Sequence, residues 1–345
     1  MSGTPLVGVH RRDAERDAYS PHTPTAADLE AAKEIVASAH GVTPLVRSNA
    51  LSDLSGRDVH LKMEGTSAVR SFKYRGALAA VAHAAAADTR RPIVTASTGN
   101  HGQGVAFAGR RLGMEVVVCC PVTTLPEKRT AMESLGATVI VAGETLTESE
   151  KRARQITEER SGLYIEDGES PRLMAGAATV VMEMLDQLPD LDTIVVPVGG
   201  GNLVAASLLA IEWTGSRASV VGVQSAEAPG ATLSWLSQKI EYHPCRTYAG
   251  GLATERPGAL SLSVMTRLLE TMVLVSDVDL RTETAHAFST LGLVVEGAAA
   301  APLAALRLFP DAIPGERVGL VVSGSWLSSD QLAEAIALDH PVRSA

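Results

Sequence analysis

Short apolar runs alternate with alanine-rich segments along most of this 345-residue chain. Such runs are typical of buried strands, and the segments between them have the length and composition of helices. Regular alternation of the two favours a parallel sheet with helices on both faces, so we predict an α/β fold. The predicted strands are Val59–Met63, Ile93–Ala96, Val116–Cys120, Val139–Val141, Tyr164–Ile165, Ile194–Val196, Val220–Val223, Val273–Val275 and Leu320–Val322.

The first helix carries its own start signal. Thr25 and Asp28 stand three residues apart, directly before the segment Leu29–Ala39. This is the spacing of a capping box, in which each side chain accepts a hydrogen bond from the other residue's backbone N–H group. We therefore predict that a helix begins at this point.

Composition excludes several classes of function. The formal net charge of −9 argues against nucleic acid or an anionic membrane as a partner. The first residues are polar, and no apolar run is long enough to cross a bilayer, so we expect neither a signal peptide nor a membrane anchor. Cys119 and Cys120 continue a strand-like run and Cys245 stands alone, which predicts reduced thiols and a cytoplasmic protein.

Lys73 lies in the run Ser71-Phe72-Lys73-Tyr74-Arg75-Gly76-Ala77, beside small residues that allow close packing. A lysine that attacks a carbonyl group must populate its neutral form, and burial or neighbouring cations favour that form. Arg70 and Arg75 flank Lys73, so we expect them to supply such cations. Taken alone, the motif favours a solvated lysine on a helix face, since most lysines are surface charges.

A glycine-rich loop, Pro197–Asn202, separates the predicted strand Ile194–Val196 from a predicted helix that begins near Leu203. Glycines allow backbone N–H groups to approach a phosphate, and a helix N-terminus adds a favourable dipole. A tight turn between strand and helix would use glycine for conformational reasons alone. The spacing Gly-x-Gly-x-x-Gly is absent, which argues against a dinucleotide site.

A second polar loop, Thr95–Gly104, follows the strand Ile93–Ala96 and gathers hydroxyl, amide and backbone N–H groups. These groups could bind a carboxylate, although a serine, threonine or asparagine helix cap would produce the same sequence. His101 lies in this loop. A loop histidine is more often a structural hydrogen-bonding group than a catalyst, so we assign it no catalytic role.

These three segments together resemble the fold type II pyridoxal-phosphate enzymes, in particular the threonine dehydratase and serine racemase group. The resemblance extends from Thr43-Pro44-Leu45 to Ser323-Gly324, with the motifs in the family's order. It implies the tryptophan synthase β-like fold of two open parallel-sheet lobes, pyridoxal 5'-phosphate as cofactor, and a homodimer. The implied domains are a large cofactor-binding domain, 1–91 and 169–345, and an inserted small domain, 92–168.

The resemblance also assigns roles to individual residues. Lys73 would bind the cofactor covalently and act as the base, with Thr98 as a second catalytic group. Asn100 would contact the cofactor's 3-hydroxyl, the glycine loop would hold its phosphate, and Ser323 would face the pyridine nitrogen. The implied cofactor-binding residues are Lys73, Phe72, Asn100, Gly199, Gly200, Gly201, Asn202, Leu203 and Ser323, and the implied substrate-binding residues are Ser97, Thr98, Gly99, Asn100 and His101.

Two of these residues bear on the type of reaction. A neutral hydroxyl at Ser323 would leave the pyridine nitrogen largely unprotonated, which suits elimination across Cα–Cβ. Without the other motifs, Ser323 would read as an ordinary turn residue. Racemases of the family carry serine at the position of Thr98, and the β-branch of threonine restricts its rotamers. We therefore favour elimination over racemisation.

The predicted function is an ammonia-lyase that converts a serine- or threonine-like 3-hydroxy amino acid into a 2-oxo acid and ammonia. Alternatives on the same scaffold are a 3-hydroxyaspartate dehydratase, an amino-acid racemase, a β-replacement synthase and a non-catalytic pyridoxal-phosphate-binding homologue.

Several residues depart from the family pattern. Arg70 replaces a usual glycine and could bind an acidic substrate group, although a surface arginine is an equal reading. Asn202 and Gly250 are further departures. In the segment Gln224–Gly230, Glu227 is the single carboxylate, so we predict no structural metal.

Overall fold

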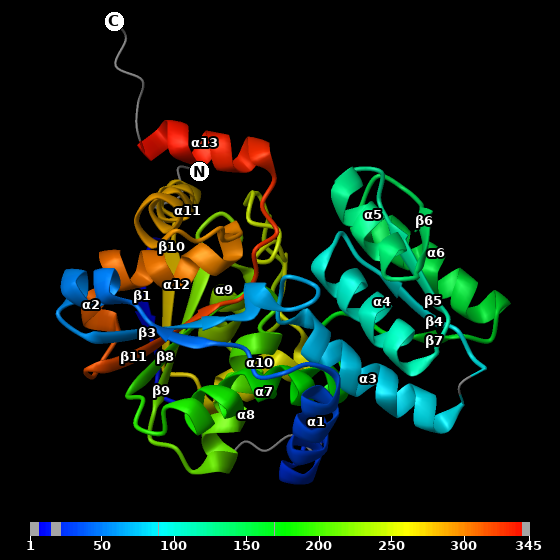
Figure 1. The fold of residues 1–345 in the computed structure, drawn as a ribbon, viewed down its shortest axis with the longest axis horizontal. Helices are drawn as coiled ribbons and strands as arrows, with labels where there is room; N and C mark the ends of the chain where they lie inside the picture. Colours follow the sequence, from blue (N-terminus) through cyan, green and yellow to red (C-terminus); the bar gives the residue numbers. More distant parts are fainter. Residues whose placement is uncertain (1–6, 15–21, 89, 169, 340–345) are drawn as a thin grey trace, which may run out of the picture. The chain divides into compact units, whose positions relative to one another are not determined.

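The computed structural model describes residues 7–14, 22–88, 90–168 and 170–339, and these form two compact units. The large unit contains the described parts of 1–23, 43–66 and 180–345, and the small unit contains 24–42 and the described parts of 67–179. Each unit has its own sheet (Figure 1).

The large unit is built on a seven-stranded sheet of order β1-β10-β9-β8-β11-β3-β2. Its five central strands are parallel, while β1 and β2 run antiparallel at the two edges. The strands are β1 (Gly8–Arg11), β2 (Leu45–Arg47), β3 (Asp58–Met63), β8 (Thr193–Pro197), β9 (Ser219–Ser225), β10 (Thr271–Val275) and β11 (Arg317–Val322).

Helices cover both faces of this sheet. On one face, α12 (Gly297–Leu308) packs its alanines against Val195, Val221 and Leu320 in one hydrophobic cluster. On the other face, Gly319 approaches Met184 of α7 (Pro171–Gln187). The remaining helices of the unit are α2 (Asn49–Ser55), α8 (Asn202–Thr214), α9 (Gly230–Ser237), α10 (Ala259–Leu268), α11 (Asp277–Leu291) and α13 (Ser329–Asp339), with short 3₁₀ turns η1 (Glu64–Thr66) and η2 (Pro310–Ala312).

The small unit is built on a four-stranded parallel sheet of order β6-β5-β4-β7. One of its faces lies in a cluster with α1, α3, α4 and α5, and the other packs against α6. The strands are β4 (Ile93–Ala96), β5 (Val116–Cys120), β6 (Thr138–Val141) and β7 (Leu163–Tyr164), and the helices are α1 (Ala26–Ala39), α3 (Lys73–Ala87), α4 (Asn100–Leu112), α5 (Pro126–Ser134) and α6 (Leu146–Glu159).

The predicted fold class is confirmed, and each predicted strand overlaps a strand of the structure. The capping box at Thr25 and Asp28 is also present at the start of α1. The strands β1 and β2 were not predicted, because Gly8–Arg11 is half polar and Leu45–Arg47 has only three residues. The predicted small domain, 92–168, spans all four strands of the small sheet, whereas the compact small unit also includes α1, α3 and the first half of α7. The domain boundaries stay a prediction.

Glycines allow the first turn of α3 to touch two other helices. A Cβ atom on Gly76 would lie 2.6 Å from the carbonyl oxygen of Leu173, and one on Gly176 would meet the carbonyl oxygen of Arg75. A Cβ atom on Gly104 of α4 would lie 2.9 Å from the carbonyl oxygen of Lys73. The backbone that carries Lys73 is therefore packed directly against α7 on one side and α4 on the other.

We predict that Gly176→Ala destabilises the protein by about 1–3 kcal/mol, because its methyl group would meet backbone that cannot rotate away. Gly41→Ala is the control, since a Cβ atom there meets nothing within 4 Å. Urea unfolding followed by circular dichroism measures both changes. Equal stability of the two variants would contradict the close packing.

Candidate active site

Lys73 is the first residue of α3, directly after Phe72 at the N-cap position. Its Nζ donates hydrogen bonds to both carboxylate oxygens of Asp167, at 2.6 and 2.7 Å. The side chain of Lys73 is 23% exposed. Asp167 was not among the predicted site residues.

The expectation that Arg70 and Arg75 supply cations near Lys73 stays a prediction. Arg75 is fully buried, and its guanidinium donates a hydrogen bond to Thr179 Oγ1 at 3.0 Å. Arg70 is exposed and has a left-handed backbone, with φ of 56°. This conformation explains why glycine would be favoured at the position. The group that contacts the amine is a carboxylate, which sequence position alone could not reveal.

The charges around Asp167 determine its ionisation. Burial alone would raise the pKa of this carboxyl group, but Lys73 and His101 outweigh burial and lower its pKa to about 2. Because the carboxylate is the stable form down to such acidic pH, Asp167 is negatively charged near neutral pH.

His101 lies on the other side of Asp167, with Nδ1 3.5 Å from the carboxylate. Its Nε2 is 3.1 Å from the hydroxyl of Thr95, which itself donates to the carbonyl oxygen of Ile165. This arrangement assigns the proton to Nε2, because the Thr95 oxygen is left to accept. Burial lowers the pKa of His101, and Lys73 lowers it further, while Asp167 acts in the opposite direction. The ring is therefore neutral near pH 7.

The polar loop between β4 and α4 is folded around one hydroxyl. Ser97 Oγ accepts hydrogen bonds from the N–H groups of Gly99 and Gly102, at 3.0 and 2.9 Å. Thr98 is exposed, and Asn100 is the first residue of α4. Lys128 of α5 lies over Gly99, where a Cβ atom would come within 2.6 Å of its Cδ. Ser97 therefore caps α4, as the alternative interpretation of this loop predicted. The loop also places the N-terminus of α4 beside the ammonium group of Lys128.

In the large unit, Gly199–Gly201 link β8 to α8. Gly199 approaches the carbonyl oxygen of Gly251, and Gly201 is left-handed, with φ of 91°. The backbone at Gly200 is open, because the atom closest to a built Cβ would be Thr254 Cγ2, at 3.8 Å. Gly201 is the N-cap of α8 and supplies no side-chain acceptor, so the first N–H groups of α8 face outward from the helix.

Unpartnered polar atoms surround this loop. Ser261 Oγ, Thr254 Oγ1 and Asn202 Oδ1 are buried and make no hydrogen bond within the described residues. Ser261 and Thr254 are the residues that a side chain at Gly201 or Gly200 would approach. Two hydroxyl donors and an outward-facing helix N-terminus form a cradle whose chemistry fits a phosphate group. Leu203, also predicted to bind the cofactor, is buried in the first turn of α8.

Ser323 follows β11, which pairs in parallel with β8, so Ser323 and the glycine loop lie at the same edge of the large sheet. The side chain is almost fully buried, at 3% exposure. The large unit thus brings together Gly199, Gly200, Gly201, Asn202 and Ser323. The small unit brings Lys73 to the loop that contains Ser97, Thr98, Gly99, Asn100 and His101. The roles assigned to these residues stay predictions.

Sequence reasoning missed Asp167, because the strand register that brings it to the site is visible only in the structure. Strands β4 and β7 pair in parallel, with Ile93 opposite Leu163. Continuing this register past the ends of both strands places position 167 opposite position 97. Asp167 therefore stands at the same offset from Leu163 as Ser97 does from its partner Ile93.

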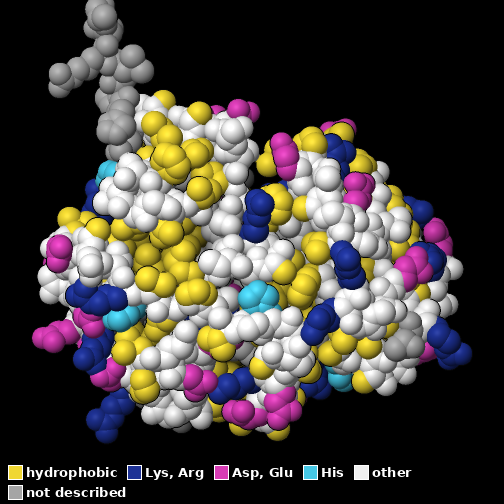
Figure 2. All heavy atoms as spheres, in the orientation of Figure 1, with side chains coloured by type: hydrophobic (Ala, Val, Ile, Leu, Met, Phe, Trp, Pro, Cys, Tyr) yellow, Lys and Arg dark blue, Asp and Glu magenta, His cyan; other side chains and the backbone are white. Residues whose placement is uncertain are grey.

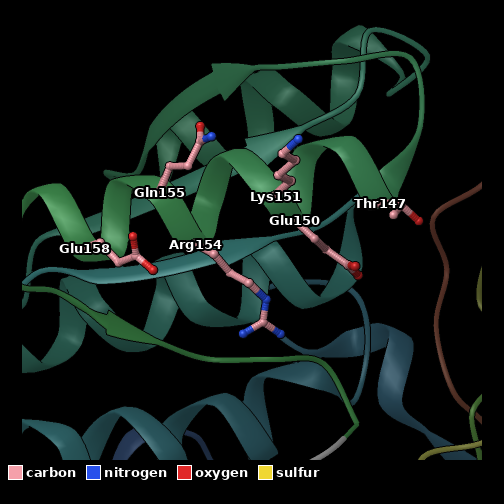
Figure 3. A pocket seen from close by; sticks show the side chains of 6 residues that line it. All are labelled: Thr147, Glu150, Lys151, Arg154, Gln155 and Glu158. Atoms are coloured by element: carbon pink, nitrogen blue, oxygen red, sulfur yellow. The ribbon is translucent and has the colours of Figure 1, made fainter.

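A shallow hollow lies elsewhere on the small unit, over α6 (Figure 3), and none of its lining residues is a predicted site residue. Arg154, labelled there, donates to Glu166 Oε2 at 2.8 Å and stacks on the ring of Tyr164. In the large unit, Gln224 Oε1 accepts hydrogen bonds from Thr232, and Glu227 Oε2 accepts the N–H group of Asp277. The expected absence of a structural metal stays a prediction.

Basic and acidic side chains are interspersed on the face drawn in Figure 2. Among the described helices, none combines the length and the apolar character needed to cross a bilayer.

Comparisons with known proteins bear on this arrangement. The family model described as "Pyridoxal-phosphate dependent enzyme" matches residues 36–324. L-threonine ammonia-lyase from Thermotoga maritima is 32% identical over 315 residues, which are 90% of this chain and 78% of that protein. The structure of the processed form of threonine deaminase isoform 2 from Solanum lycopersicum has a TM-score of 0.85 at 26% identity, over 97% of this chain and 100% of that one. A pyridoxal 5'-phosphate-dependent aspartate racemase has a TM-score of 0.84 at 26% identity, over 91% and 99% of the two chains.

Proposed function

The chain belongs to the family of pyridoxal-phosphate-dependent enzymes, and from this premise we propose that it is an ammonia-lyase acting on a 3-hydroxy amino acid such as L-threonine. The family, the cofactor and the lyase class predicted from the sequence are confirmed by the matching family model and by relatives named L-threonine ammonia-lyase. The contact between Lys73 and Asp167 carries the proposal, because Asp167 links the amine of Lys73 to the loop that contains His101.

The residues present fit the cofactor. We propose that Lys73 is its covalent partner and that Gly199–Asn202 hold its phosphate, with the hydroxyls of Ser261 and Thr254 donating to phosphate oxygens. Phe72, Asn100 and Leu203 would contact it as well. When bound, pyridoxal phosphate supplies a ring that withdraws electrons from the bonds of Cα. Ser323 would present a neutral hydroxyl to the ring nitrogen.

The chain's own groups would bind the substrate and move the proton. The N–H groups of the loop Ser97–His101 would bind the substrate carboxylate, with the helix dipole of α4 favouring its charge. The Nζ of Lys73 would accept the Cα proton with its lone pair. Thr98 is exposed and would be the second group able to exchange a proton. Loss of the 3-hydroxyl as water and later uptake of one water molecule would convert L-threonine into 2-oxobutanoate and ammonia.

A second candidate is a dehydratase of 3-hydroxyaspartate. Arg70 keeps a left-handed backbone that costs about 1 kcal/mol for a residue other than glycine. It lies three residues before Lys73, where a guanidinium could pair with a second substrate carboxylate. An aspartate racemase is also among the similar structures. These observations favour an acidic substrate without excluding threonine.

We also propose a cytoplasmic homodimer. All three cysteines are free thiols, and Cys119 and Cys120 are buried in β5, which suits a reducing compartment. Figure 2 shows apolar side chains gathered on the large unit, a feature that suits an interface between copies. Sedimentation analysis of the purified protein reports the number of chains.

We predict that the protein releases ammonia and a 2-oxo acid from at least one 3-hydroxy amino acid. Lys73→Ala should lower this rate by about 10²–10⁴, because it removes the base. The assay uses L-threonine, L-serine and 3-hydroxyaspartate, each with coupled detection of both products. Preference for 3-hydroxyaspartate would select the second candidate.

Other outcomes of this assay would contradict the proposal. Ammonia release that survives Lys73→Ala would remove Lys73 from the mechanism. Chiral analysis that finds the other enantiomer without oxo acid would indicate a racemase. A substituted amino acid formed in the presence of a thiol would indicate a β-replacement synthase. A purified protein that stays colourless after addition of the cofactor would indicate a non-catalytic homologue.

We predict that Ser261→Ala weakens binding of pyridoxal phosphate about tenfold, or roughly 1.4 kcal/mol, because one donor to the phosphate is lost. Ser263→Ala is the control, since the Ser263 hydroxyl donates to the carbonyl oxygen of Leu260 in the same helix. Absorbance titration of the cofactor-free chain gives both dissociation constants. The phosphate cradle would be misplaced if the two variants bound the cofactor equally.

A further inference from the structure

We propose that Asp167 is a positioning residue that holds the Nζ of Lys73 as its counter-ion whenever this amine is not bound to the cofactor. The role of Asp167 in turnover rests on the proposed function. The contact between Asp167 and Lys73 does not depend on that function. Asp167 lies outside the three sequence motifs that indicate the cofactor.

The contact is two-pronged. Both oxygens of Asp167 accept from Nζ, at 2.6 and 2.7 Å, so the ammonium group is held in one place and one direction. The opposite end of the side chain is held as well, because the Lys73 backbone packs against Gly104 of α4. The side chain of Lys73 is thus fixed at both ends, and 23% of it is exposed.

The charges that face this pair come from two helices and one loop. Lys73 comes from α3, His101 from α4 and Asp167 from the segment after β7. The neighbouring acidic residue, Glu166, pairs instead with Arg154 of α6, and Arg75 of α3 bonds to Thr179. Among these groups, Lys73 is the one that donates hydrogen bonds to the carboxylate of Asp167.

This pairing has a consequence in each of two states. In the cofactor-free chain, both carboxylate oxygens accept hydrogen bonds from Nζ, and these contacts slow any reaction at this amine. During turnover, the free Nζ of Lys73 would accept the Cα proton of the substrate and gain a positive charge. Asp167 would stabilise this charge without touching the substrate.

The first test measures the free amine directly. Full-length protein freed of cofactor is acetylated with trace acetic anhydride at fixed pH, and the rate at Lys73 is measured by peptide mass spectrometry. Asp167→Asn should raise this rate about tenfold or more, because the opposite charge is lost. Glu166→Gln is the matched control, since it makes the same chemical change one residue away and disrupts only the pair with Arg154.

The second test uses the cofactor-loaded enzyme. In Asp167→Asn, the acid limb of the pH profile of kcat should move to lower pH by about one unit, and the plateau of kcat should fall about tenfold. KM should change little, because Asp167 does not bind substrate. Asp167→Glu keeps the charge and should restore the acid limb, at least in part.

The outcomes separate this inference from the proposed function. If Asp167→Asn and Glu166→Gln give the same acetylation rate and pH profile, Asp167 has no positioning role, even when both variants are active lyases. If no variant shows lyase activity but acetylation is faster in Asp167→Asn alone, the pairing is supported and the proposed function fails. A fall in kcat with no change in either the pH profile or acetylation would mean a merely structural role and would overturn the inference.

Discussion

Direct contact between helix backbones at the first turn of α3 is the constraint on which the small unit depends. Gly76 and Gly176 bring α3 and α7 together, and Gly104 brings α4 against the carbonyl group of Lys73. A side chain at any of these positions would push the helices apart. The amine is therefore directed by main-chain packing, which is stiffer than side-chain contacts, toward the loop that contains His101.

Parallel strands explain where the remaining groups come from. In each sheet, polar residues that follow neighbouring strands lie at the same edge. In the small sheet this edge carries Ser97 after β4 and Asp167 after β7, and in the large sheet it carries the glycine loop after β8 and Ser323 after β11. The same architectural rule thus produces an amine with its carboxylate in one unit and, in the other, a glycine loop whose chemistry fits a phosphate group.

Local sequence was sufficient for part of this picture. Apolar runs located the parallel strands, and the motifs around Lys73 and Gly199–Asn202 indicated cofactor chemistry because each is contiguous. Asp167 escaped notice because it meets Lys73 across 94 positions of the chain. Ser261 and Thr254 escaped for the same reason. The hydrogen bond from Arg75 to Thr179 could not be predicted either, because adjacency in a helix does not fix the direction of a side chain.

The brevity of β7 has an evolutionary consequence. Two residues, Leu163 and Tyr164, hold this strand in register with β4. A one-residue insertion between Tyr164 and Asp167 would leave those pairings intact, yet it would turn the acidic side chain to the opposite side of the chain. Descendants of such a protein could therefore exchange or discard the acid beside the amine while the scaffold stayed unchanged. Charge at this centre can diverge faster than the architecture that supports it.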